Sequence, residues 1–141
     1  MRSLMSTSPP PRRAGSASAA EPGNPLTEQN QTAEHEVPFH TFKLDTRFVD
    51  ALAAVGIINT FPIQALTLPL ALGGSDIIGQ AKTGTGKTLG FGLPLLQRIV
   101  NQQAEPNHPH ALVVVPTREL ALQVAKDLTT AAARTELRVT A

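Results

Sequence analysis

The chain is 141 residues long, and its 12 Lys and Arg side chains nearly balance its 11 Asp and Glu side chains, which leaves a net charge of +1. This length predicts one domain at most. Because the net charge is small, long-range attraction to nucleic acid is not expected, and a few well-placed basic side chains would have to hold such a partner. The lack of cysteine excludes a disulfide framework and a Cys-ligated metal site, and it fits a reducing, cytoplasmic location.

Residues 1–38 differ in composition from the rest of the chain. They contain six of the 12 prolines, whereas all five Phe residues lie at Phe39 or later. A segment so poor in large apolar residues cannot bury enough surface to offset backbone ordering, which costs about 1–2 kcal/mol per residue. We therefore predict a disordered, low-complexity tail over 1–38. A transit peptide is the less favoured alternative, because prolines 9–11 oppose an amphipathic helix. No apolar run approaches the roughly 18 residues of a membrane span, so we expect no membrane association.

Apolar periodicity predicts two helices after the tail. The first follows Asp45, a suitable N-cap, and ends before Gly56, a suitable C′ residue. Its apolar face comprises Leu44, Phe48, Leu52 and Val55. The second helix starts at Pro62 and ends at Gly73.

Three short apolar segments alternate with two further helices. Residues 76–80 and 111–116 are predicted to be buried strands, and residues 136–141 begin a third strand. One helix, over about 86–100, contains Pro94, and the other follows Thr117 as its N-cap. This alternation predicts an α/β layer fold, in which right-handed crossovers join the strands of a parallel sheet.

The stretch AKTGTGKT, residues 81–88, predicts a phosphate-binding loop. A strict P-loop has Gly, four residues and then Gly-Lys-Ser/Thr, and here Ala81 replaces the first glycine. The predicted strand before the loop and helix after it supply the context that the motif requires. In that context Lys87 reaches the β- and γ-phosphates, and the Thr88 hydroxyl reaches Mg²⁺. The alternative is a flexible polar turn.

Three motifs together resemble the N-terminal part of a DEAD-box RNA helicase. AKTGTGKT looks like motif I of that family, in which the first position is normally Ala. GIINTFPIQ, residues 56–64, is similar to the family's Q motif, and Phe39 holds the place of an isolated aromatic 17 residues before its first glycine. VVVPTRELALQV looks like motif Ia. The resemblance covers about residues 39–141. It implies part of a RecA-like ATP-binding domain, with the Q motif at about 39–65.

The resemblance also implies roles for individual residues. Gln64 would hydrogen-bond the adenine edge, because a carboxamide has both a donor and an acceptor, and Phe39 would pack on the base. Lys87 and Thr88 would be the catalytic residues, with Thr88 also binding Mg²⁺ through its hydroxyl. The implied ATP-binding residues are Phe39, Gln64, Ala81, Lys82, Thr83, Gly84, Thr85, Gly86, Lys87 and Thr88. The implied, sequence-independent contacts with the RNA backbone come from Pro116, Thr117, Arg118 and Glu119.

The Q motif departs from the family pattern at three positions. Ile57 stands where an aromatic is usual, Thr60 where Pro is usual and Phe61 where Thr is usual. Because Phe61 cannot cap the following helix, Thr60 is the expected substitute. Without the resemblance, Gln64 would be interpreted as a surface residue near a helix start, and Thr117 as a helix cap.

The chain has no Asp-Glu-Ala-Asp sequence. The resemblance therefore implies an ATP-dependent RNA helicase, using ATP and Mg²⁺, only for an intact parent protein with a second RecA-like domain. We expect this chain alone to be inactive, since it lacks the acid that orients water and the arginine finger of the second domain. The alternative is a truncated nucleotide-binding module without turnover. No protein partner is indicated.

Overall fold

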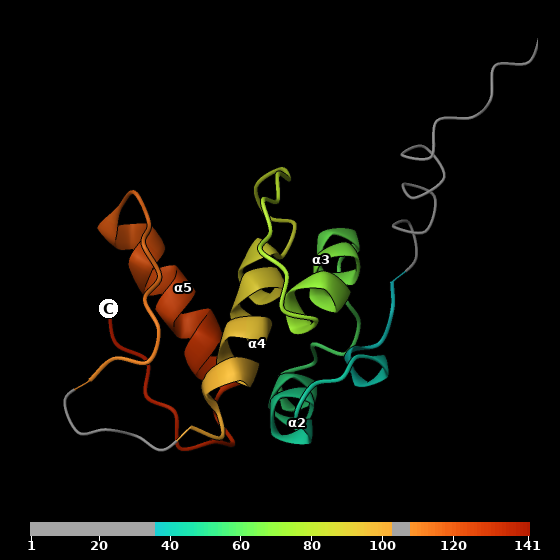
Figure 1. The fold of residues 1–141 in the computed structure, drawn as a ribbon. Helices are drawn as coiled ribbons and strands as arrows, with labels where there is room; N and C mark the ends of the chain where they lie inside the picture. The colour runs from blue at the N-terminus through green and yellow to red at the C-terminus, as the bar shows by residue number, and fades with distance from the viewer. Residues whose placement is uncertain (1–35, 103–107) are drawn as a thin grey trace, which may run out of the picture.

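The computed structural model describes residues 36–102 and 108–141. These residues form the short 3-10 helix η2 (Phe39–Thr41) and the α-helices α2 (Thr46–Ala54), α3 (Pro62–Leu72), α4 (Lys87–Ile99) and α5 (Arg118–Ala131). Helix α4 lies between α3 and α5 and contacts both, while α2 contacts α5 and η2 (Figure 1). None of the helices in the described ranges is long and apolar enough to cross a membrane.

The folded chain begins before the predicted boundary at residue 38. The Thr60 backbone N–H donates to the Val37 carbonyl at 2.8 Å, and the Val37 N–H donates to Thr60 Oγ1 at 3.2 Å. Pro38 forms an isolated antiparallel bridge with Asn59. Residues 37–38 therefore belong to the folded part. Residue 36 is also described, whereas residues 1–35 of the predicted tail lie outside the described residues.

Predicted helix caps are confirmed at three helix ends. Asp45 Oδ1 accepts from the Arg47 backbone N–H at 3.0 Å at the start of α2, and Gly56 follows that helix with a φ of 82°. Thr117 Oγ1 accepts from the Leu120 N–H at 3.2 Å at the start of α5. Each of these devices acts within a few residues of chain, so the local sequence is sufficient to specify it.

Helix α3 starts differently from the prediction. The Thr60 hydroxyl accepts from Val37, so it does not cap α3, and the residue at the N-cap position is Phe61. A phenyl ring cannot accept a hydrogen bond from the helix. Gln64 instead reaches back, and its Oε1 accepts from the Phe61 backbone N–H at 2.8 Å. The expectation that Thr60 substitutes as the cap is wrong, because a partner 23 residues away takes the hydroxyl.

One apolar core joins the helices. Its buried members are Phe39, Phe48, Leu52, Leu68, Leu93, Leu96, Val124, Leu128, Ala131 and Ala132. Burial of each large side chain contributes about 1.5–3 kcal/mol relative to exposure. At the contact between α4 and α5, a Cβ on Gly92 would overlap Leu128 Cδ2, so a residue without a side chain sets how closely the two helices pack.

The structure does not confirm the predicted parallel sheet. Residues 76–80, 111–116 and 136–141 carry no strand assignment, and no ladder of backbone hydrogen bonds joins them within the described chain. The predicted burial of 76–80 is also wrong, since Ile78 is fully exposed. A strand requires a hydrogen-bonded neighbour, and apolar periodicity does not encode that neighbour.

The alternation of side chains nevertheless persists in the later two segments. Val113 and Val115 pack against the core, whereas Leu112 and Val114 are 82% and 83% exposed. Leu137 and Val139 also pack against the core, while Arg138 between them is exposed. Each segment therefore keeps the two-residue period of a strand and covers the helices with one face.

Candidate nucleotide-binding site

Residues 81–86 form a loop that leads directly into α4 and projects beyond the end of that helix (Figure 1). Gly84 and Gly86 have φ values of 78° and 73°, in the left-handed region that side chains disfavour. The Thr85 hydroxyl donates to the Lys82 carbonyl at 2.8 Å and closes a tight turn within the loop. The two glycines of the motif therefore stand at the two positions of the loop where the backbone has a positive φ.

The N-terminus of helix α4, where the loop ends, carries a partial positive charge. The helix spans 13 residues from Lys87, and Gly86 at its N-cap has no side chain with which to satisfy the first N–H groups. The first N–H groups of a helix have no partner within it, and the aligned peptide dipoles add a partial positive charge there. Together these features favour an anion at the start of α4.

The Lys87 side chain folds back over the loop. Its Nζ donates to the Ala81 carbonyl at 2.6 Å and also to the Lys82 carbonyl. The ammonium is therefore held among backbone oxygens of the same loop that the motif predicts to surround phosphate. Thr88 follows it in the first turn of α4 and is partly buried.

Gln64 connects α3 with the loop. Its side chain is only 1% exposed, so the interpretation of Gln64 as a surface residue is wrong. Its Oε1 accepts from the Phe61 N–H, and its Nε2 donates to the Gly86 carbonyl at 2.7 Å. The donor and the acceptor of the carboxamide are thus both engaged within the protein.

Two aromatic residues lie in different surroundings. Phe39 is 1% exposed and belongs to the apolar core, and its N–H donates to the Ile58 carbonyl at 3.0 Å. Phe61 is 49% exposed and lies against Gly86, where a Cβ on the glycine would come within 2.5 Å of Phe61 Cδ2. The packing of Phe39 on a base stays a prediction. The sequence marked Phe61 only as a departure from the Q motif, because its place beside the loop depends on Gly86, which lies 25 residues further along the chain.

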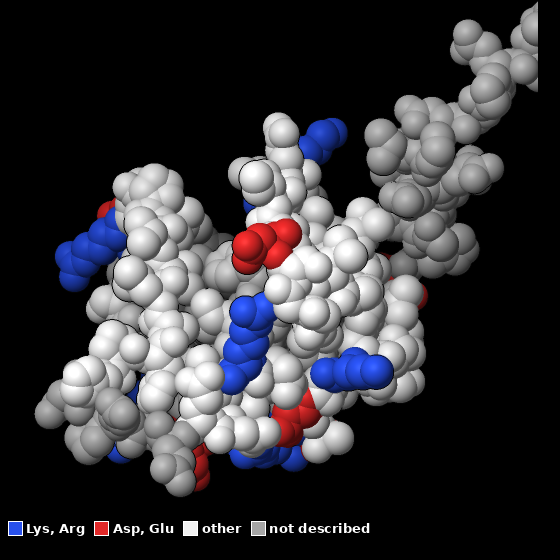
Figure 2. Space-filling view, in the orientation of Figure 1, with Lys and Arg blue, Asp and Glu red and all other residues white. Residues whose placement is uncertain are grey.

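The residues predicted to contact RNA cluster at the start of α5. Pro116, Thr117, Arg118 and Glu119 are all exposed, and Thr117 is the N-cap. These four residues lie at the same end of α5. Helix α4 lies between α5 and α3, the helix that carries Gln64 (Figure 1). Basic side chains on the face shown in Figure 2 are spread over several elements rather than gathered into one patch. The RNA contacts stay a prediction.

Comparison with known proteins decides the family. The family model described as DEAD/DEAH box helicase matches residues 61–141. The chain belongs to the DEAD/DEAH box helicase family. The predicted resemblance is thereby confirmed.

Similar proteins carry the same family description in their names. The chain is 48% identical over 96 residues to ATP-dependent RNA helicase RhlB of Xanthomonas oryzae pv. oryzae, which covers 65% of this chain and 17% of that protein. It is 47% identical over 90 residues to ATP-dependent RNA helicase CshA of Listeria monocytogenes, which covers 64% of this chain and 17% of that protein. The chain thus spans about a sixth of the length of these relatives.

Solved structures of DEAD-box proteins share the fold. The RNA helicase Prp28 from Chaetomium thermophilum, solved with ADP bound, matches with a TM-score of 0.65 and 38% identity, over 69% of this chain and 24% of that one. A DEAD box protein from Methanococcus jannaschii matches with a TM-score of 0.61 and 34% identity, over 72% of this chain and 27% of that one. These structural neighbours are RecA-like DEAD-box helicase domains, and the chain matches a part of each.

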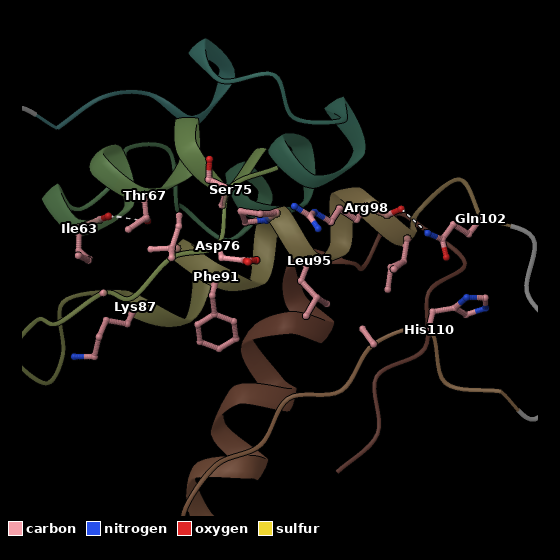
Figure 3. A pocket seen from close by; sticks show the side chains of 17 residues that line it. Ile63, Thr67, Ser75, Asp76, Lys87, Phe91, Leu95, Arg98, Gln102 and His110 are labelled. Atoms are coloured by element: carbon pink, nitrogen blue, oxygen red, sulfur yellow. Dashed lines mark hydrogen bonds between the residues drawn. The ribbon is translucent and has the colours of Figure 1, made fainter. Parts of the chain in front are cut away.

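A cavity of about 670 Å³ lies between α3 and α4 of this DEAD-box chain. Figure 3 shows Thr67 and Phe91 on its walls and Lys87 at one end, with the amine of Lys87 directed away from the other lining side chains. The cavity is mainly apolar, so it does not extend the polar surroundings of the loop. Its lining includes Asp76, Ile77 and Gly79, which belong to the segment 76–80 that was predicted to be a buried strand.

The residues around the loop suit a nucleotide better than a metal ion bound by protein alone. Among the described residues, no group of three or more His, Cys, Asp or Glu side chains could hold a metal ion. The helix N-terminus and the Lys87 ammonium both favour phosphate oxygens. The Thr88 hydroxyl is a single hard ligand, which fits Mg²⁺ only if phosphates and water complete its coordination.

Proposed function

We propose that the chain is part of the ATP-binding domain of an ATP-dependent RNA helicase, and that residues 81–88 hold the nucleotide phosphates. The observation that carries the proposal is the loop itself. Gly84 and Gly86 turn the backbone through left-handed conformations at the start of a 13-residue helix, and the Lys87 ammonium is folded over the same loop.

Each residue of the loop has a physical role in this proposal. Backbone N–H groups at the start of α4 donate to phosphate oxygens, and Lys87 exchanges the Ala81 and Lys82 carbonyls for the β- and γ-phosphates. The Thr88 hydroxyl is the protein's ligand to Mg²⁺, which in such sites neutralises charge that develops on the phosphates. In this proposal Phe39 packs on adenine and Gln64 reads its edge once nucleotide binding makes these two side chains accessible, since each is 1% exposed in the free chain.

RNA enters the proposal through the start of α5. Backbone N–H groups and the exposed Arg118 would contact phosphates of an RNA strand, without reading bases. Since the chain spans about a sixth of its relatives, duplex unwinding belongs to the whole protein. A cytoplasmic location also stays a prediction.

A nucleotide-binding module without turnover is the second candidate. It is favoured because the contacts that carry the proposal, the start of α4 and the Lys87 ammonium, account for the binding of phosphates alone. Hydrolysis requires a group that orients the attacking water and a transition-state arginine, which contributes about 10³–10⁵ in rate. The two candidates share the nucleotide site and differ in turnover.

Calorimetric titration of ATP with Mg²⁺ into the purified chain tests the shared nucleotide site. We expect saturable binding by the wild type, and a loss of at least about tenfold in affinity for Lys87→Ala because the variant removes the ammonium from the phosphate site. Lys126→Ala is the matched control, because Lys126 is an exposed lysine on α5. Equal affinities for the wild type and Lys87→Ala would overturn the phosphate-binding role of the loop. RNA-stimulated phosphate release by the same sample would favour the enzyme over the module.

A further inference from the structure

We infer that Phe61 is a stacking surface for the base of a bound purine nucleotide. The inference deepens the proposed function and rests on it, because it assumes that the loop before α4 holds the phosphates. It adds a third residue to Phe39 and Gln64, and the ring of this residue is accessible without rearrangement. Phe61 is 49% exposed in the free chain, whereas the other two residues are each 1% exposed.

Folding does not explain a phenylalanine at position 61. The residue is the N-cap of α3, where Ser, Thr, Asp and Asn are preferred because their side chains accept a hydrogen bond from the helix. A phenyl ring accepts none, and Gln64 binds the Phe61 N–H instead. Phe61 also belongs neither to the apolar core nor to the partly buried side chains that pack against it. The ring therefore supplies neither a cap nor a buried core contact.

The ring is held against the end of the phosphate loop. A Cβ on Gly86 would come within 2.5 Å of Phe61 Cδ2, so the ring occupies space that a side chain at position 86 would need. The backbone of Phe61 is fixed as well, because its carbonyl accepts from the N–H groups of Gln64 and Ala65 at 2.9 and 3.0 Å. An aromatic side chain on a fixed backbone has little freedom to lose when a ligand binds, which favours affinity.

The position of Gly86 places this ring beside a bound nucleotide. Gly86 is the N-cap of α4, and the first N–H groups of α4 are the proposed donors to phosphate oxygens. In a nucleotide only the ribose separates the base from the α-phosphate, so a ring beside the phosphate site is close enough to meet the base. Every base has a π-face on which an aromatic ring can stack. Phe61 should therefore contribute equally to the binding of adenine and guanine nucleotides.

Three substitutions at position 61 separate stacking from folding. Phe61→Ala removes the ring. Phe61→Thr also removes it but supplies a capping hydroxyl, so this variant should fold at least as stably as the wild type. Phe61→Tyr keeps an aromatic face. Phe91→Ala is the matched control, because Phe91 is similarly exposed, at 42%, but lies on the wall of the apolar cavity (Figure 3).

Calorimetry compares ligands with and without a base. ATP, GTP and inorganic tripolyphosphate, each with Mg²⁺, would be titrated into the wild type and the variants. The inference predicts that Phe61→Ala and Phe61→Thr lose at least about fivefold in affinity for both ATP and GTP and keep wild-type affinity for tripolyphosphate. Phe61→Tyr and Phe91→Ala should bind all three ligands as the wild type does.

Three other results would overturn the stacking role. The first is wild-type affinity for ATP in Phe61→Ala and Phe61→Thr. The second is an equal loss for tripolyphosphate, which would mean that the ring acts on the loop and not on a base. The third is a loss confined to ATP, which would mean recognition of the adenine edge.

Lys87→Ala keeps this inference apart from the proposed function. If tripolyphosphate binding falls in Lys87→Ala, the phosphate-binding role of the loop stands, and the Phe61 variants alone decide the stacking role. No binding of any of the three ligands by the wild type, or unchanged binding in Lys87→Ala, would overturn both.

Fluorescence measures the same contact independently. The chain has no Trp or Tyr, so Phe61→Trp introduces a single indole, whose emission a stacked purine quenches. We expect quenching that saturates with ATP and with GTP but does not occur with tripolyphosphate, and no quenching in Phe91→Trp. Quenching by tripolyphosphate, or none by ATP where calorimetry shows that ATP binds, would contradict the stacking role.

Discussion

The junction between α3 and α4 and the segment that enters α5 illustrate two ways of holding a functional segment. At the junction, a buried side chain bridges 22 residues of sequence, and glycines allow the two helices to approach closely. The segment 111–117 has one capping bond at Thr117, and Leu112 and Val114 on it are more than four-fifths exposed. The proposed nucleotide loop is therefore fixed by contacts within the described chain, whereas the proposed RNA segment is fixed on one face only.

The largest expected effect is a loss of unfolding free energy when a buried leucine, rather than an exposed one, is shortened in these two regions. Leu93 of α4 is fully buried, and Leu93→Ala should lower the free energy of unfolding by about 2–5 kcal/mol because it leaves a cavity. Leu112→Ala should change the same quantity by less than about 0.5 kcal/mol. Urea unfolding followed by circular dichroism measures both. A Leu112→Ala loss as large as that of Leu93→Ala would show that segment 111–116 is packed on both faces.

The next largest effect is the difference in unfolding free energy between alanine substitutions at the two left-handed glycines of the loop. Alanine at either position meets an unfavourable φ, at a cost of about 1–2 kcal/mol. Gly86→Ala adds overlap with Gln64 and Phe61, so its total should reach about 2–4 kcal/mol, while Gly84→Ala adds none. The same urea experiment separates them, and equal losses would mean that α3 does not crowd Gly86.

The smallest effect concerns the cap of α2, where α2 meets the end of α4. Asp45 binds the Arg47 guanidinium through its carboxylate, with Nη2 to Oδ2 at 2.7 Å, and its own N–H donates to Gln97 of α4. The hydrogen bonds from the Arg47 side chain, and then from its backbone N–H, lower the pKa of Asp45 from 3.8 to about 2. Because the folded pKa is depressed, this stabilisation is fully present above pH 4 and is lost as the pH falls from about 4 to 2.

A pH series checks this assignment. Asp45→Asn keeps a capping oxygen but removes the titration, so the difference in unfolding free energy between the wild type and the variant should shrink between pH 4 and 2. A difference that stays constant over that range would contradict the lowered pKa of Asp45.

Local signals were sufficient to predict the ends of the helices. Asp45, Gly56 and Thr117 act within their own helix turns, and each does what its residue type predicts. Motif I was equally readable, because Gly84 and Gly86 encode the turns of the loop in the identity of the residues themselves.

Contacts between residues that are distant in the sequence could not be predicted in the same way. Thr60 was expected to cap α3 but binds Val37, and Gln64, interpreted without the resemblance as a surface residue, lies buried against Gly86. The pattern of 76–80 predicted a buried strand, and Ile78 is exposed because no neighbouring strand pairs with that segment in the described chain. Each of these outcomes depends on a partner that lies far away in the sequence.

The central claim, that the loop before α4 binds nucleotide phosphates, is tested most directly by NMR. Backbone amide shifts of the ¹⁵N-labelled chain would be followed as ATP and Mg²⁺ are added. The account predicts saturable shifts at Gly84, Gly86, Lys87 and Thr88, with little change at Arg118 and Glu119. Unchanged loop amides, or shifts confined to the start of α5, would contradict it.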